Sequence, residues 1–283
     1  IDFIAYDEEG IVLDQASWPR VTDELPRPVK DIKPHPHGLE IGTLQRLLRD
    51  SKPPSEGGGA RTPLRYFLRN TFSAMSNTRC EEVIGKAGLL ATRKPASLKP
   101  DEVVALLTAF SDVRLPSPPT DCLSPIEDLL IKKGLSKAID SRFVSTVTRE
   151  PKVSNGNPFQ IEVGLIFGGD LPGDQPIQVL RFANRVPLMY QQGGCLLTKA
   201  LESVDWKRYG LDHPGGRGIP KGPAAVLIHL ASTNVQFTSE AKEALSDNSE
   251  VFDEIRLAML EVGRGLRNHL KKQKQKLSFS ILT

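Results

Sequence analysis

The sequence predicts a chain of mixed α+β class, in which a small all-α domain is followed by an α/β domain that ends in a long helix. Two proline-rich stretches, residues 18–37 and 115–119, mark the boundaries, because proline lacks an amide donor and favours extended backbone in the residue before it. Between them, apolar residues recur every three or four positions, as in helices, whereas strand-like runs follow the second stretch. A length of 283 residues suits two domains, each with its own core.

The chain opens on a predicted β-hairpin. Residues 1–6 (IDFIAY) form a strand-like run, residues 7–10 (DEEG) form a turn, and residues 11–13 (IVL) form a returning strand. An isolated hairpin is only marginally stable in water. We therefore interpret it as the edge of a sheet whose other strands lie upstream of Ile1.

Four short helices are expected in the all-α domain. Leu44 and Leu48 lie at helical spacing in the first helix, and Pro63 and Pro100 are well placed to open the second and the fourth. Thr78, with an acidic residue three positions later, is expected to cap the third helix. Helices this short are stable only when their apolar faces pack together, so they form one small domain.

The α/β domain is expected to begin with a helix and to contain at least three strands. The Ser-Pro pair at 124–125 is expected to start the helix. Residues 161–167 and 179–184 are expected to be neighbouring strands joined by a loop. Residues 224–230 (AAVLIHL) form a continuous apolar run, which is typical of a central strand covered on both faces.

A long helix is predicted from about Ser249 to Lys276. Its apolar positions keep steps of three or four residues, and we expect them to pack against the sheet. The stripe comprises Val251, Ile255, Ala258 or Met259, Val262, Leu266 and Leu270. Beyond Glu261 the helix carries only basic charge, which we expect to project toward a partner.

Composition excludes several classes of protein. Apolar residues make up 39% and charged residues 25% of the chain, as in a folded protein rather than a disordered one. The three cysteines lie far apart without a CxxC spacing, and the five histidines show no metal-ligand spacing, so neither disulfides nor a metal site are expected. No apolar run approaches the roughly 20 residues that span a bilayer. We expect a cytoplasmic protein with no membrane partner.

The sequence contains no complete catalytic site. The glycine-rich stretches at 57–59 and 215–218 lack the Lys-Ser/Thr pair of a phosphate-binding loop. No HExxH motif, nucleophile elbow or His/Asp cluster appears either. We therefore expect no ATP hydrolysis by this chain alone.

Lys242 is the first candidate binding residue. It follows the apolar run at 224–230 and precedes the long helix, and a lysine on such a loop can reach a phosphate as a compact point charge. The alternative is a solvated surface lysine, which spacing alone favours.

Two candidate nucleic-acid-binding features follow. Trp206 and Tyr209 flank Lys207, so the rings could stack on bases while the cation pairs with phosphate; alternatively, Trp206 fills the core. The end of the long helix carries cations that include Lys271 and Lys272. These either contact a polyanion or are solvated charges favoured by the helix dipole.

Six short segments follow one another along nearly the whole chain. They are PHPHGL (34–39), PTDCLSP (119–125), NPF (157–159) leading into EVG (162–164), FANRVPL (182–188), VDWKRYG (204–210) and STNV (232–235). In this order they resemble the B subunit of topoisomerase VI, a type IIB DNA topoisomerase (an isomerase). The family is mostly archaeal and works as a heterotetramer of two A and two B subunits. A single segment of this length could match by chance, whereas six in the same order are specific for the family.

This resemblance implies an architecture. Residues 1–30 would be the tail of a GHKL ATPase domain, residues 31–114 a helix-two-turns-helix domain, and residues 115–283 a transducer domain with a ribosomal-protein-like fold. ATP with Mg²⁺ would be bound mainly by the missing part of the ATPase domain. The stretch at 51–62 is longer than the family's usual turn.

The resemblance also implies functional residues and partners. Lys242 would contact the γ-phosphate of ATP, and Trp206, Lys207 and Tyr209 match the family's DNA-engaging Trp-Lys-x-Tyr element. The partners would be the topoisomerase VI A subunit, a second B subunit and double-stranded DNA, in the nucleoid. The chain would transmit an ATP-driven conformational change to the DNA-cleaving A subunit during double-strand passage, which relaxes and decatenates DNA.

Two other functions are compatible with the sequence. One is a nucleic-acid-binding module of ribosomal-protein-like fold, which would bind with a steep salt dependence and be indifferent to nucleotide. The other is a topoisomerase-like assembly protein that docks a cutting subunit without strand passage.

Overall fold

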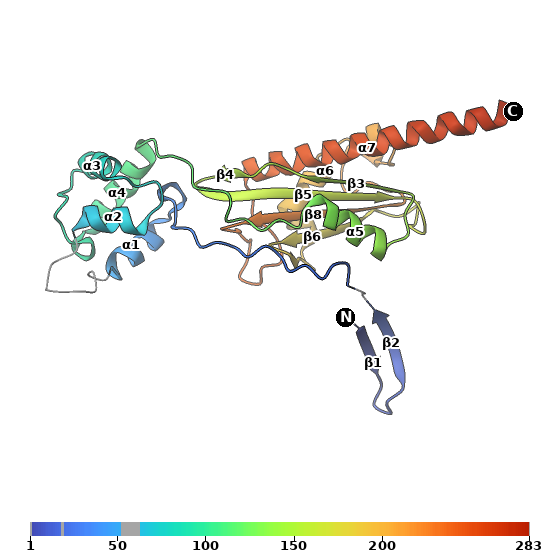
Figure 1. Ribbon diagram of the computed structural model, residues 1–283, viewed down its shortest axis with the longest axis horizontal. Helices are drawn as coiled ribbons and strands as arrows, with labels where there is room; N and C mark the ends of the chain where they lie inside the picture. The colour runs from blue at the N-terminus through green and yellow to red at the C-terminus, as the bar shows by residue number, and fades with distance from the viewer. Residues whose placement is uncertain (1, 18–19, 52–62, 283) are drawn as a thin grey trace. The chain divides into compact units, whose positions relative to one another are not determined.

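The computed structural model describes residues 2–17, 20–51 and 63–282, so the stretch at 51–62 lies almost wholly outside the described residues. The chain forms two compact units (Figure 1). The helical unit comprises Val29–Leu123 and Lys152–Phe159. The sheet unit comprises Ile1–Pro28, Ser124–Pro151 and Gln160–Thr283.

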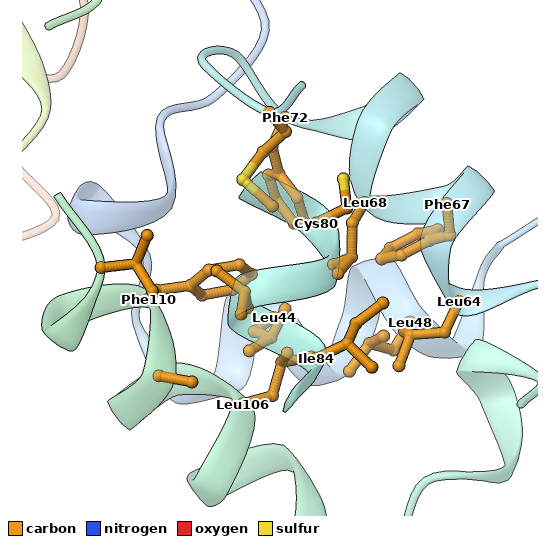
Figure 2. Close-up of a cluster of buried hydrophobic side chains, with 14 of the residues drawn as sticks. Leu44, Leu48, Leu64, Phe67, Leu68, Phe72, Cys80, Ile84, Leu106 and Phe110 are labelled. Carbon is orange, nitrogen blue, oxygen red and sulfur yellow. The ribbon is translucent and has the colours of Figure 1, made fainter. Parts of the chain in front are cut away.

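Four α-helices build the helical unit, as the apolar spacing predicts. They are α1 (Ile41–Arg49), α2 (Leu64–Thr71), α3 (Asn77–Lys86) and α4 (Pro100–Asp112), accompanied by the 3₁₀ turns η1 (Pro36–Gly38) and η2 (Pro95–Ser97). Their apolar faces meet in one core, in which Phe72 packs edge-on against Phe67 and Phe110 (Figure 2). Such edge-to-face pairs add to the free energy gained from burial alone.

The prediction that Thr78 caps the third helix is wrong. Ser76 holds the N-cap position, where its side chain accepts a hydrogen bond from the amide of Arg79 at 3.3 Å. Thr78 lies inside α3. Both residues carry a hydroxyl, so the cap is decided by where the backbone leaves the extended conformation.

The predicted N-terminal hairpin is confirmed. Strand β1 (Asp2–Tyr6) pairs antiparallel with β2 (Val12–Ser17), and the two form a sheet of their own. The carboxylate of Asp7 accepts hydrogen bonds from the amides of Glu9 and Ile11, which closes the turn.

The main sheet has the strand order β3-β5-β8-β6-β7, and β4 pairs with β5 outside this path. Its strands are β3 (Phe143–Thr148), β4 (Lys152–Ser154), β5 (Asn157–Phe167), β6 (Gln178–Ala183), β7 (Val186–Pro187) and β8 (Ala224–Ser232). The central position predicted for residues 224–230 is confirmed. The prediction that residues 161–167 and 179–184 are neighbours is wrong, because β8 lies between β5 and β6.

The position of β8 follows from its burial. Almost every residue of β8 is buried, and a strand this apolar is favoured where both of its faces are covered. It pairs in parallel with β6, with Arg181 opposite Ile228. A parallel pair needs a long crossover, and the segment between the two strands supplies it with α6 (Leu196–Glu202) and the 3₁₀ turns η3 (Gln192–Gly194), η4 (Trp206–Tyr209) and η5 (Pro214–Gly216).

The helix expected to start at 124–125 begins later, as α5 (Asp128–Ala138). Glu127 precedes it with a left-handed φ of 73°, so the helix does not extend back through this residue. The amides of Ile126 and Glu127 donate to the carboxylate of Glu162, which draws the chain out of helical geometry.

The predicted long helix is α7 (Ser249–Leu282), and its apolar stripe is buried from Val251 to Leu266. It packs beside β3, and its C-terminal turns extend beyond the sheet (Figure 1). A Cβ at Gly263 would lie 2.8 Å from the Tyr209 ring, so glycine permits this close contact. Across the described ranges, no helix has the length and apolar character needed to cross a membrane.

Replacing Val262 with Asp should unfold the sheet unit or lower its melting temperature sharply. Val262 is fully buried on α7, and an unpaired carboxylate in an apolar interface costs several kcal/mol. Asn268→Asp is a matched control at an exposed position of the same helix, and it should melt like the parent in a circular dichroism scan. An unchanged melting temperature for Val262→Asp would show that α7 is not docked on the sheet.

Candidate functional site

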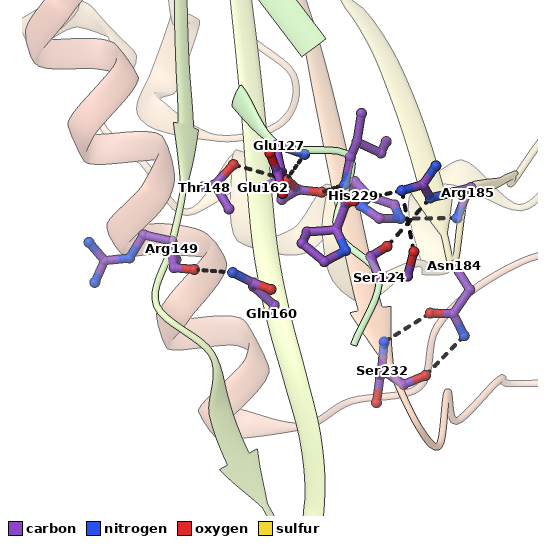
Figure 3. A network of polar contacts seen from close by, with 12 residues as sticks. Ser124, Glu127, Thr148, Arg149, Gln160, Glu162, Asn184, Arg185, His229 and Ser232 are labelled. Atoms are coloured by element: carbon purple, nitrogen blue, oxygen red, sulfur yellow. Dashed lines mark hydrogen bonds and ion pairs between the residues drawn. The ribbon is translucent and has the colours of Figure 1, made fainter. Parts of the chain in front are cut away.

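A buried carboxylate, that of Glu162 on β5, joins several segments of the sheet unit (Figure 3). Its Oε1 accepts hydrogen bonds from the Thr148 hydroxyl at 2.9 Å and the Glu127 amide at 2.7 Å. Its Oε2 accepts from the Ile126 amide and from His229 Nδ1, both at 2.7 Å. Burial alone would raise the pKa of Glu162, but the hydrogen bonds from His229, Ile126 and Thr148 outweigh it and hold the pKa below its ordinary value.

His229 is bonded through both of its ring nitrogens in this network. The amide of Arg185 donates to His229 Nε2 at 3.0 Å, so the ring proton is on Nδ1 and is donated to Glu162. The guanidinium of Arg185 donates in turn to the carbonyls of Ser124 and Pro125. The network therefore fixes the turn that carries Arg185 from two sides.

Strands β6 and β8 are parallel and end at the same edge of the sheet, with Ala183 opposite Leu230. The turn after β6 contains Asn184 and Arg185, with φ of 46° and 68°, a conformation uncommon outside glycine. The Asn184 carboxamide donates to the Ser232 carbonyl and accepts from the Ser232 amide, both at 2.9 Å (Figure 3). Ligands of parallel sheets bind beyond the carboxyl ends of the strands, so this edge is a candidate site.

Lys242 lies near the tip of a loop that leaves this edge. We call residues 236–246 the Lys242 hairpin, because Phe237 pairs with Leu245 in an antiparallel bridge and backbone hydrogen bonds close the loop on either side. At the tip, the Lys242 amide donates to the Ser239 carbonyl at 3.1 Å.

The Lys242 side chain is exposed, and it makes no ion pair with any described residue. Its φ of 56° is left-handed, which costs free energy for a residue with a Cβ. Such conformations persist where the surrounding structure enforces them and are frequent at functional sites. The hairpin thus presents a free ammonium group on a closed, preorganised loop.

The returning strand of the Lys242 hairpin is anchored to the start of α6. The Leu196 amide donates to the Leu245 carbonyl at 3.1 Å, and the Leu245 amide donates to Cys195 Sγ at 3.5 Å. Lys199 of α6 forms an ion pair with Asp247 at 2.7 Å. The hairpin and the residue that follows it are therefore bonded directly to α6 and to the residue before it.

The Trp206–Tyr209 turn, η4, divides its residues between core and surface. Trp206 is fully buried, and its Nε1 donates to the Leu201 carbonyl at 2.8 Å. Tyr209 is buried edge-on against Trp206, with ring centroids 6.0 Å apart. Lys207 is exposed. The alternative in which Trp206 fills the core therefore describes its position, and the DNA-engaging role of the element stays a prediction.

The basic end of α7 lies next to η4. A Cβ at Gly210 would overlap Leu270, so the residue after η4 is in close contact with the helix. Lys271 and Lys272 follow directly and are exposed. The structure therefore brings together the two candidate nucleic-acid-binding features, whereas Lys242 lies on a separate loop between β8 and α7.

Metal ligands are not grouped in the described part of the chain. No set of three His, Cys, Asp or Glu side chains there could hold an ion. Cys80, Cys122 and Cys195 are free and buried, and burial raises the pKa of the Cys80 and Cys122 thiols.

Sequence reasoning gave no role to Glu162, His229 or Asn184. A signal was present for the first two, since each is the only ionisable residue of its strand. A polar group in a strand buried on both faces must find a partner. The contact between Asn184 and Ser232 had no such signal, because it depends on the pairing of β6 with β8.

Comparison with known proteins gives a consistent result. Residues 118–279 match a family model described as topoisomerase VI B subunit, transducer. The chain is 50% identical to the B subunit of type 2 DNA topoisomerase 6 from Methanococcoides burtonii over 254 residues, which is 90% of this chain and 39% of that protein. It is 46% identical to the same subunit from Archaeoglobus fulgidus, over 90% of this chain and 40% of that protein.

A more distant relative is the B subunit of type 2 DNA topoisomerase 6 from Saccharolobus islandicus, 34% identical over 97% of this chain and 49% of that protein. The chain spans about two fifths of the length of the first two relatives. Among solved structures, the B-subunit of the DNA gyrase from Myxococcus xanthus aligns with a TM-score of 0.33 and 16% identity, over 49% of this chain and 42% of that one, which is too low to carry an argument. The matches favour neither of the two alternative functions.

The stability of the sheet unit should depend on the charge of Glu162. Its pKa is lower in the folded protein than in the unfolded chain, so the contribution of Glu162 is fully present above the ordinary pKa of 4.5 and is lost as pH falls through the lower folded pKa. Glu162→Gln should flatten this dependence. At neutral pH it should lower the free energy of unfolding by about 1–3 kcal/mol. The reason is that the NH₂ group of the glutamine would face the N–H and O–H donors that the carboxylate accepts from.

Denaturant titrations between acid and neutral pH measure this effect. Glu240→Gln removes an exposed carboxylate and serves as the control. Parallel pH profiles for Glu162→Gln and the parent would contradict the assigned network.

Proposed function

This chain belongs to the family of topoisomerase VI B subunits, and from that premise we propose that the whole protein is the ATP-dependent B subunit of a type IIB DNA topoisomerase. In it, this part passes a nucleotide-driven movement to the subunit that cuts DNA. The match of residues 118–279 to the transducer family carries the proposal, because this range includes both the Lys242 hairpin and nearly all of α7.

The position of Lys242 supports a contact with the terminal phosphate of ATP. Its ammonium group is exposed, has no ion-pair partner in the described ranges, and lies on a hairpin closed by backbone hydrogen bonds. A lysine acts on phosphate as a compact point charge, so it needs reach and freedom from other partners. ATP with Mg²⁺, held mainly by residues upstream of Ile1, supplies the hydrolysable phosphoanhydride.

A movement of the Lys242 hairpin has a contiguous route to α7. The hairpin bonds to the start of α6 through Leu196, and α6 packs against α7. At the other end of α6, Leu201 accepts from Trp206, and the neighbouring Tyr209 packs on Gly263 of α7. Packed elements of this kind move as rigid bodies rather than deform. Contact between Lys242 and phosphate would therefore favour one position of α7 over another.

Ion pairs fix α7 to the end of β3. Arg149 pairs with the buried Glu254 at 2.6 Å and with Glu261 at 3.3 Å. Because Glu254 and Glu261 lie two turns apart, this double contact resists sliding of the helix along the sheet. The C-terminal turns of α7 can then act as a lever arm.

The architecture and partners follow the family. We assign residues 1–30 to the tail of the GHKL ATPase domain, residues 31–114 to a helix-two-turns-helix domain and residues 115–283 to the transducer. The partners are the topoisomerase VI A subunit, a second B subunit and double-stranded DNA, in the cytoplasm and associated with the nucleoid. Lys207, Lys271 and Lys272 are exposed and form the DNA-contacting surface, and the buried rings of Trp206 and Tyr209 hold the turn that presents Lys207.

In the complete enzyme, Lys242→Ala should reduce ATP hydrolysis by about 10²–10³-fold, as expected when one preorganised charge is removed from a site of phosphate chemistry. Lys242→Gly removes the charge without straining the backbone, because glycine adopts the left-handed φ freely. It therefore separates the effect of the lost charge from an effect on the backbone. Both variants should lose activity similarly in a steady-state ATPase assay. Parental activity in either variant would remove Lys242 from the proposed role.

Lys207→Ala should weaken DNA binding without changing the melting temperature, because Lys207 is exposed. The slope of the logarithm of affinity against the logarithm of salt concentration should fall by about one, as for one lost phosphate contact. Lys133→Ala on α5 is the control, since it removes an equally exposed lysine elsewhere. Trp206→Ala should instead destabilise the fold by about 3–5 kcal/mol. Identical DNA-binding isotherms for Lys207→Ala and the parent at low salt would show that this turn only supports the fold and does not contact DNA.

A further inference from the structure

The two strands of the Lys242 hairpin are anchored in different ways. The returning strand bonds to the start of α6 through the Leu196 amide and through Cys195 Sγ, as described above. The segment that leads into the outgoing strand begins where β8 ends, at Ser232. There the Asn184 side chain holds the Ser232 backbone through a donor and an acceptor, both at 2.9 Å. Substitution of Asn184 therefore removes both of these hydrogen bonds on the outgoing side and leaves the bonds on the returning side in place.

The support behind Asn184 extends to the core of the sheet unit. Its own amide donates to the Leu230 carbonyl at 2.8 Å. The next amide, that of Arg185, donates to His229, which is bonded to Glu162. Asn184 thus joins an ordered turn to Ser232, the last residue of β8 before the loop that carries Lys242.

The bonds continue from this anchor toward the hairpin. The amide of Asn234 donates to the Ser232 hydroxyl at 3.2 Å. Two residues later, the Gln236 carbonyl accepts from the Ser246 amide at 3.0 Å and from its hydroxyl at 3.1 Å. The path from Asn184 to the hairpin therefore consists of backbone already constrained at short intervals, which leaves few torsions free to absorb a shift at Ser232.

We propose that Asn184 is a positioning residue for Lys242: its carboxamide fixes the end of β8, so that the Lys242 hairpin starts from one position relative to the bound nucleotide. This inference rests on the proposed function. Asn184 does not touch phosphate; it acts through the hairpin. Loss of the carboxamide leaves the hairpin closed but lets its outgoing strand shift.

A second reason for asparagine at this position must be separated from the first. With φ of 46°, the turn favours asparagine or glycine over other residues whatever the side chain contacts. Asn184→Gly retains the backbone and removes both side-chain hydrogen bonds. Asn184→Asp keeps the acceptor for the Ser232 amide and loses the donor to the Ser232 carbonyl. Comparison of the two variants therefore separates the backbone preference of the turn from the contribution of the side-chain hydrogen bonds to Ser232.

The test uses the complete heterotetramer of A and B subunits. We expect Asn184→Gly to lower the rate of ATP hydrolysis roughly tenfold, as for the loss of two hydrogen bonds, with a smaller loss for Asn184→Asp. The melting temperature of Asn184→Gly should stay close to that of the parent. Gln178→Ala is the matched control, because it removes an exposed amide at the other end of the same strand.

A double-mutant cycle decides whether Asn184 acts through Lys242. The affinity for a non-hydrolysable ATP analogue is measured for Lys242→Ala, Asn184→Gly and the double variant. If Asn184 positions Lys242, Asn184→Gly weakens binding in the parent and has no further effect in the Lys242→Ala background. Additive losses, or parental hydrolysis in Asn184→Gly, overturn the positioning role. Parental hydrolysis in Lys242→Ala instead overturns the proposed function itself, so the two failures are distinguishable.

Discussion

The sheet unit depends on keeping one carboxylate charged inside an apolar sheet. An ionised group without partners is strongly disfavoured there, and Glu162 is tolerated because four donors saturate its two oxygens. Those donors come from the segment before α5, from β3 and from β8, so segments far apart in sequence are held at one point. Removal of one donor would leave part of this buried charge without a hydrogen bond, which would lower the free energy of unfolding.

The same network lies behind the loop that carries Lys242. Behind the carboxyl ends of β6 and β8, the chain Glu162–His229–Arg185 fixes the turn after β6. Beyond it, Lys242 is exposed near the tip of its hairpin, whose returning strand is bonded to the start of α6. In the proposed function, a phosphate contact at Lys242 would shift an equilibrium only between states that differ in their contacts with the phosphate. The neighbouring contacts through α6, Trp206 and Tyr209 then supply a packed route to α7.

Residue types usually associated with nucleic-acid binding are used in two ways in η4. The rings of Trp206 and Tyr209 are buried, and the close approach of α7 to Tyr209 is possible because Gly263 lacks a side chain. Lys207 remains at the surface, near the cations of the last turns of α7. Aromatic residues thus fix the position of the turn, and only the cations are available to a polyanion, whose affinity comes mainly from phosphate neutralisation.

The sequence alone determined the features that follow from local periodicity. These are the four helices, the N-terminal hairpin, the continuous apolar strand β8 and the buried stripe of α7, since spacing of apolar residues dictates which face can be buried. The order of six segments also indicated the family. Tertiary structure alone decided that β8 separates β5 from β6, that α5 starts only after Glu127, and that Asn184 meets Ser232. Each of these depends on a partner distant in sequence, and periodicity carries no information about which distant backbone or carboxylate will satisfy a given amide.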